Sequence, residues 1–107
     1  MTIIVNCMKK NIYKNDKIPV NGEIFNILLK HKNVVIEKIL SSNLVPEKEY
    51  IQDQDEWVIL LKGEANILIA DKIFQLIPGD FIFIKSGTTH KVLKTSSGTI
   101  WLAIHIY

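Results

Sequence analysis

The stretch that decides the fold has two parts, EWVILLKG at residues 56–63 and GDFIFIKSGTTH at residues 79–90. In the first part the carboxylate of Glu56 opens an apolar run that ends at a glycine. In the second part His90 follows another apolar run and a turn that contains glycine. Carboxylate and imidazole groups are common metal ligands and common acid–base catalysts. We therefore expect two potential ligands on adjacent strands, inside a β-barrel rather than on its surface.

The rest of the chain also has the pattern of an all-β protein. Runs rich in Ile, Leu and Val alternate with short turns that contain Gly, Asn, Asp, Ser or Pro. Residues 23–30 also fit a helical period, but so short a helix is marginal, and a strand is favoured. Many short strands with close turns predict a sandwich, a jelly roll or a barrel. The expected strands are residues 23–30, 34–41, 56–62, 64–69, 72–77, 80–84, 90–95 and 99–106.

Length and composition indicate one globular domain. With 107 residues the chain is long enough for a single core, and short enough that self-association would add stability. Hydrophobic residues make up 48% of the chain and charged residues 22%, which is ordinary for a soluble protein. We expect residues 1–22 to form a short first strand and an irregular polar arm, and residues 23–107 to form the barrel.

The charged residues argue against a nucleic-acid partner. All 13 basic residues are Lys, and the net charge is only +2. Lysine lacks the bidentate donor fork with which arginine reads phosphate and guanine. No apolar run approaches the roughly 20 residues that span a bilayer, and the N-terminus does not resemble a signal peptide. Cys7 is the only cysteine, which fits a reducing compartment. We expect a cytoplasmic protein with no membrane partner.

The first quoted stretch resembles the first motif of the cupin superfamily, small β-barrels of jelly-roll type. That motif ends with a Glu, six residues and a Gly, which is the spacing of Glu56 and Gly63. A metal-binding cupin usually opens the motif with two histidines that are separated by one residue. The equivalent positions here are Tyr50 and Gln52, so the histidine pair is missing.

The second quoted stretch resembles the second motif of the same family. Gly79, Gly87 and His90 stand at the family spacing, whereas Lys85 replaces its Pro and Lys94 replaces its Asn. That Asn faces inward in the family, so the lysine either pairs with the site carboxylate or is an exposed strand residue. The resemblance covers most of the chain and implies a cupin-type double-stranded β-helix, a jelly-roll barrel.

The last expected strand offers a third candidate ligand. One of its faces carries Trp101, Ala103, His105 and Tyr107, and the other carries only Ile and Leu. We expect the Ile and Leu face to pack in the core and the other face to line a cavity. His105 is then either a site residue or a hydrogen-bonded histidine near an open end of the barrel.

Two classes of function remain open. In the first, the barrel binds a small polar organic molecule through Glu56, His90 and His105, with weak or atypical metal binding. In the second, these residues and Gln52 or Tyr50 hold Fe(II), Mn(II), Ni(II) or Zn(II) in an oxygenase, isomerase or lyase that acts on a small organic acid or sugar. A metal-free variant uses Glu56 or His90 as the general base and Tyr50 as the proton donor.

A homodimer is also expected. Apolar residues in the segments 56–61 and 80–84 alternate to both faces of their strands, and Trp57 faces away from Glu56. A small barrel has one interior, so a second apolar face should pack against another sheet or another chain.

Overall fold

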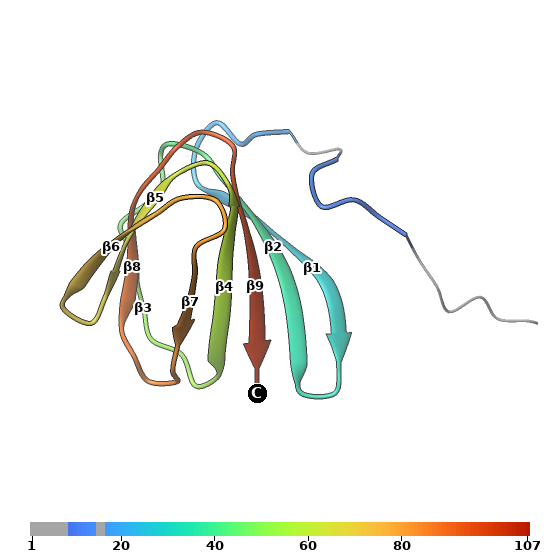
Figure 1. Ribbon diagram of the computed structural model, residues 1–107, viewed down its shortest axis with the longest axis vertical. Coiled ribbons are helices and arrows are strands. Elements are labelled where there is room, and N and C mark those ends of the chain that lie inside the picture. Colours follow the sequence, from blue (N-terminus) through green and yellow to red (C-terminus); the bar gives the residue numbers. More distant parts are fainter. Residues whose placement is uncertain (1–8, 15–16) are drawn as a thin grey trace, which may run out of the picture.

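The structure is a computed structural model that describes residues 9–14 and 17–107. The expected N-terminal strand and Cys7 lie outside the described residues. Within the described part, all regular elements are β-strands joined into antiparallel sheets (Figure 1). No helix in this part is long and apolar enough to cross a membrane. The strands are β1 (Glu23–His31), β2 (Val34–Ser41), β3 (Glu49–Tyr50), β4 (Asp55–Lys62), β5 (Ala65–Ile69), β6 (Lys72–Leu76), β7 (Phe81–Ile84), β8 (His90–Thr95) and β9 (Thr99–Ile106).

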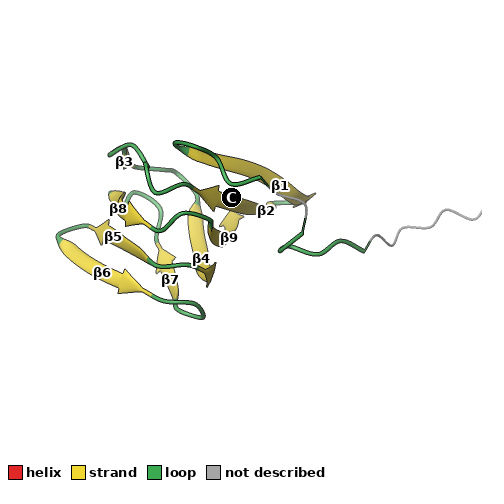
Figure 2. Ribbon diagram, turned by 90° about the horizontal axis from the view of Figure 1, so that it is seen from above, coloured by secondary structure: helices red, strands yellow, loops and turns green. Residues whose placement is uncertain are grey.

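The strands form two sheets that face each other as layers. The five-stranded sheet has the order β1-β2-β9-β4-β7, and the four-stranded sheet has the order β3-β8-β5-β6. Figure 2 shows the two layers from above, with β1 and β2 extending beyond the smaller sheet. Consecutive strands such as β7, β8 and β9 lie in alternate sheets, which is the chain path of a jelly roll. The predicted all-β jelly-roll fold is confirmed.

The turn residues of the sequence located the strands well, with two exceptions. The strand β3 was not predicted, because its two residues follow a polar segment without an apolar run and pair only briefly with β8. The helical alternative for residues 23–30 is wrong, since these residues form β1 and pair with β2.

The core lies between the two sheets, and it corrects the prediction for the last strand. Trp101 and Ala103 are 3% and 0% exposed and face the smaller sheet, whereas Ile106 is 39% exposed. The prediction that the Ile and Leu face is the core face is therefore wrong. Both faces of β9 are largely apolar, so hydrophobicity alone does not select the inner one. The register does, because it aligns Ala103 with the buried Val58 of β4.

The outer face of the five-stranded sheet is apolar across its whole width. The paired residues Leu29, Ile36, Ile104, Trp57 and Phe83 form one row from β1 to β7. Phe83 is 57% exposed. Trp57 faces away from the core, as predicted. Soluble monomers rarely expose so wide an apolar surface.

Candidate functional site

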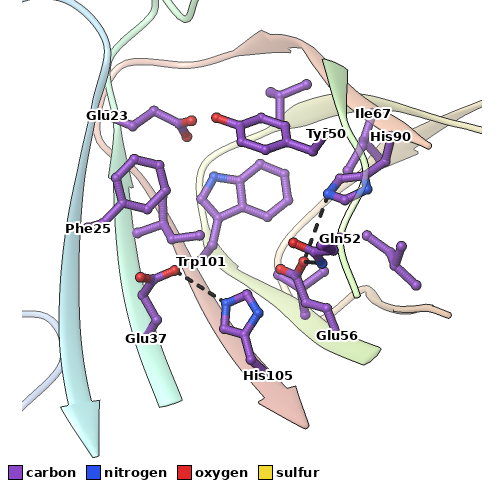
Figure 3. A pocket seen from close by; sticks show the side chains of 14 residues that line it. Glu23, Phe25, Glu37, Tyr50, Gln52, Glu56, Ile67, His90, Trp101 and His105 are labelled. Atoms are coloured by element: carbon purple, nitrogen blue, oxygen red, sulfur yellow. Dashed lines mark hydrogen bonds and ion pairs between the residues drawn. The ribbon is translucent and has the colours of Figure 1, made fainter. Parts of the chain in front are cut away.

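A pocket of about 160 Å³ lies between the two sheets, beside the apolar core. The five residues that the sequence singled out all line it, namely Tyr50, Gln52, Glu56, His90 and His105. The prediction that Glu56 and His90 stand on adjacent strands is wrong. Glu56 belongs to β4 and His90 to β8, which lie in different sheets. The chain crosses between the sheets from β4 to β8, and the two side chains meet across the interior (Figure 3).

The first polar group of the pocket is built around Glu56. This carboxylate is 7% exposed, and its Oε1 accepts a hydrogen bond of 2.6 Å from Nε2 of Gln52. Nε2 of His90 lies 3.9 Å from the same oxygen. The ring of Tyr50 stacks on the His90 ring, with 5.6 Å between centroids, because the two residues are paired across β3 and β8. The buried carboxylate is thus held by an amide and faces an imidazole.

The hydrogen bonds of His90 fix the roles of its ring nitrogens. Nδ1 lies 3.3 Å from the carbonyl oxygen of Thr88, which can only accept, so Nδ1 carries the proton and donates. In the neutral ring Nε2 is then an acceptor. It faces Glu56 Oε1, another acceptor, across a gap too long for a direct hydrogen bond. A donor between the two atoms, from water or from a ligand, satisfies both.

The second polar group joins His105 to Glu37. His105 is the direct neighbour of Glu56 across β4 and β9, and it faces the pocket. Its ring nevertheless turns toward β2, where Nε2 lies 3.4 Å from Glu37 Oε1 (Figure 3). Nδ1 lies 3.1 Å from Nε2 of Gln54, an amide donor, so His105 accepts there and donates to Glu37.

Two glutamines in the segment before β4 therefore have structural roles. Gln52 holds Glu56, and Gln54 holds His105. Sequence reasoning named Gln52 only as a possible metal ligand and did not name Gln54 as a site residue, because hydrogen bonds to other strands cannot be seen in a polar sequence segment.

The donor set does not fit a metal ion in its present arrangement. In residues 9–14 and 17–107, no group of three or more His, Cys, Asp or Glu residues is placed to hold one. Glu56 and His90 face each other, but His105 is bonded to Glu37, and Gln52 presents an amide N–H rather than its oxygen to the site. Catalytic zinc and non-haem iron sites use three protein ligands. The metal ligand set from the sequence stays a prediction.

Sequence reasoning missed the pocket residues that β1 and β2 supply, among them Glu23, Phe25 and Glu37. Burial raises the pKa of the Glu23 carboxyl, a hydrogen bond from Ser41 lowers it, and the charge of Glu37 raises it further. The available signal was a single carboxylate in each apolar strand, Glu23 at the start of β1 and Glu37 within β2. It could not be used, because the sequence does not show which face of β1 or β2 is the inner one.

Tyr50 supplies a protonated hydroxyl to the pocket. Burial raises its pKa, and the charges of Glu23 and Glu56 add to that rise. The phenol therefore stays a hydrogen-bond donor at neutral pH. Lys94, in contrast, is an exposed residue of β8 outside this pocket, so of its two readings the exposed strand residue is the correct one.

Replacing Glu23 with Gln is expected to stabilise the fold at pH 7 and above. The folded-state pKa is raised, so the protonated carboxyl contributes stability below its unfolded value of 4.5, and this is lost as the pH rises through the folded pKa. Glutamine keeps an acceptor for Ser41 without the charge. Urea midpoints at pH 4 and pH 8 measure the effect. An equal change in Glu47→Gln, at an exposed position, would contradict this explanation.

Comparison with known proteins identifies the family. The Cupin domain family matches residues 44–106, more than half of the chain. The chain belongs to the cupin family. No curated protein matches this cupin. A protein from Ralstonia eutropha JMP134, described as a "putative mannose-6-phosphate isomerase", shares 30% identity with this cupin. The comparison covers 94% of this chain and 98% of that one, with a TM-score of 0.84.

Two further solved structures show the same fold at lower identity. KdgF from Halomonas sp. is 12% identical, with a TM-score of 0.74 and coverage of 79% of this cupin and 80% of KdgF. A cupin superfamily protein from Desulfitobacterium hafniense DCB-2 is 19% identical, with a TM-score of 0.73 and coverage of 85% and 83%. Both likenesses concern the fold alone.

Proposed function

We propose that this cupin binds a small polar organic molecule in the pocket between its sheets. The observation that carries the proposal is the facing pair His90 and Glu56, whose acceptor atoms are 3.9 Å apart in a buried setting. With the His90 ring neutral, a donor between these two atoms satisfies both. Apolar walls with a few convergent polar groups are the usual make-up of a ligand site. The wall here includes Val58, Ile67 and Trp101.

The volume limits the ligand. A cavity of about 150 Å³ holds benzene, so a pocket of about 160 Å³ suits roughly six to ten non-hydrogen atoms. The pocket is smaller than the ~300–1,000 Å³ of sites for drug-sized molecules. The ligand is thus the size of a short-chain metabolite rather than a nucleotide.

A thermal-shift screen of small metabolites tests this proposal. A ligand at a hundred times its dissociation constant stabilises the fold by ~2.7 kcal/mol, which corresponds to a rise in Tm of about 10 °C. We expect His90→Ala to abolish the shift and His31→Ala, at the exposed end of β1, to leave it unchanged. Ligands whose effect survives His90→Ala would place the site elsewhere.

A second candidate is acid–base catalysis without a metal, for example an epimerisation. It is favoured by the protonated hydroxyl of Tyr50, a residue whose ring stacks on His90 and whose hydroxyl points toward Glu23 in the same pocket (Figure 3). In that case His90 or Glu56 takes a proton and Tyr50 gives one. Turnover of a bound ligand that is lost in Tyr50→Phe, with binding retained, would establish this activity.

The metal-dependent alternative is tested by elemental analysis of protein purified without chelator. We expect clearly less than one Fe, Mn, Ni or Zn per chain, because His105 is engaged with Glu37. About one metal per chain, lost in both Glu56→Ala and His90→Ala, would support a metal enzyme and contradict this expectation.

We also propose that a second copy of this cupin covers the outer face of the five-stranded sheet. The apolar row from Leu29 to Phe83 crosses five strands and is about 19 Å wide at the ~4.8 Å strand spacing. The neighbouring exposed residues Phe81 and Ile106 extend the apolar row. A twofold dimer joins the same patch on both copies.

A further inference from the structure

The charge of the pocket is one-sided. Its lining contains three carboxylates, Glu23, Glu37 and Glu56, and two histidines, and no lysine is found among its described lining residues. The whole sequence has no arginine. Even with both imidazoles protonated, carboxylates would outnumber cations. The potential in the pocket is therefore negative and disfavours a carboxylate or phosphate group.

The pKa values of two ionisable groups in the pocket, Glu23 and Tyr50, are both raised. Burial raises the pKa of Glu23, and the charge of Glu37 raises it further. Burial also raises the pKa of Tyr50, together with the charges of Glu23 and Glu56. The carboxylates are thus close enough to disfavour additional negative charge on one another and on the phenol.

The hydrogen-bonding groups of the pocket also favour a ligand that donates hydrogen bonds. The amide of Gln52 already donates to Glu56, and Nε1 of Trp101 donates to Ser41 Oγ at 3.0 Å. His105 donates to Glu37. These three donors are used within the protein, and the Tyr50 hydroxyl can accept as well as donate, while the facing acceptors Glu56 Oε1 and His90 Nε2 are not bonded to each other. A ligand between these two atoms has to donate to both.

We propose that the ligand is a small primary ammonium compound, whose nitrogen lies between Glu56 and His90. An ammonium group has donors and no acceptor, which is the complement of this lining. The rings of Trp101 and Phe25 line the same pocket and provide aromatic faces for the cation or its apolar body. This inference rests on the proposed function, because it names the ligand class of the same pocket.

One lysine, Lys48, lies near the pocket, but it does not offset the negative charge of the lining. Nζ of Lys48 is 5.1 Å from the centroid of the Tyr50 ring, and the lysine is exposed and outside the lining. Water and salt screen an exposed charge far more than the buried carboxylates.

Two matched sets of probes test the ligand class by calorimetric titration. The first set is benzylammonium, benzyl alcohol and benzoate, and the second is ethanolammonium, ethylene glycol and glycolate. Within each set the charge changes from positive through neutral to negative, while the size stays nearly constant. We expect the ammonium member of at least one set to bind at least tenfold more tightly than its neutral counterpart, and the anions to bind weakest.

Variants locate the effect in the pocket. Glu37→Gln and Glu56→Gln keep hydrogen-bonding capacity but remove charge, and each is expected to reduce the preference for ammonium at least threefold. Glu47→Gln makes the same change at an exposed position outside the lining and is expected to leave the preference intact. Circular dichroism confirms that each variant is folded.

The inference is overturned if no ammonium probe exceeds its neutral counterpart, or if an anion binds most tightly. It is also overturned if the preference survives both pocket variants. The proposed function fails separately, when the wider metabolite screen finds no ligand whose shift depends on His90. A neutral or anionic ligand with a His90-dependent shift would leave the proposed function intact and refute the ammonium class alone.

Discussion

Replacing Gly63 with Ala is expected to lower the free energy of unfolding by about 3–5 kcal/mol. Gly63 follows β4 with a φ of +90°, a conformation that L side chains rarely adopt. A Cβ there would lie 2.3 Å from Thr99 Oγ1 and 2.9 Å from Thr99 Cα. Thr99 is fully buried and bonded to Ser96, so it cannot move aside easily. Domains are stable by only about 5–15 kcal/mol, so the variant is close to unfolding.

Gly79→Ala is the matched control for this change. Gly79 has a similar φ of +97°, but a Cβ there would meet no atom within 4 Å. It should therefore show only the backbone strain, about 1–2 kcal/mol. Urea denaturation of both variants measures the difference. Equal losses at the two glycines would show that the close approach of Thr99 is unimportant.

Replacing Phe83 with Glu is expected to convert a dimer into a monomer at micromolar concentration. Phe83 is 57% exposed on the outer face of β7, so the substitution disturbs no core contact. In a twofold interface each copy would bury one unpaired carboxylate. A total penalty of about 3 kcal/mol for the two carboxylates weakens association roughly a hundredfold. Light scattering after size-exclusion chromatography gives the mass of each form.

Ile73→Glu is the control for this experiment. Ile73 is 65% exposed on β6, in the other sheet, and the substitution should leave the mass unchanged. A monomeric wild type at micromolar concentration would contradict the proposed dimer. An unchanged dimer in Phe83→Glu, with dissociation in Ile73→Glu, would move the interface to the smaller sheet.

The sequence was informative where local chemistry decides the structure. Glycines and prolines placed most strand ends, and the spacing from Glu56 to Gly63 and from Gly79 to His90 located two residues of the pocket. These signals are local, because turns and strand periods depend on neighbouring residues. They led to the correct fold and to the membership of the cupin family.

The parts of the fold and the pocket that could not be predicted depend on the register between strands that are distant in the sequence. The inner face of β9 could not be chosen, since both of its faces are largely apolar, and the wrong one was selected. Glu23 and Glu37 were missed for the same reason. They reach the pocket through the pairing of β1 with β2 and of β2 with β9. His105 faces the pocket, but only the structure shows that it is bonded to Glu37 rather than to Glu56.

The central claim is that His90 and His105, on opposite sheets, belong to one ligand site inside the barrel. Histidine-selective ¹⁵N NMR during titration with a ligand from the screen tests it most directly, because the chain has three histidines and His31 is an exposed internal control. We predict that the ring resonances of His90 and His105 shift with the same dissociation constant while those of His31 stay constant. Saturation of binding without a shift of His90 and His105 would contradict this account.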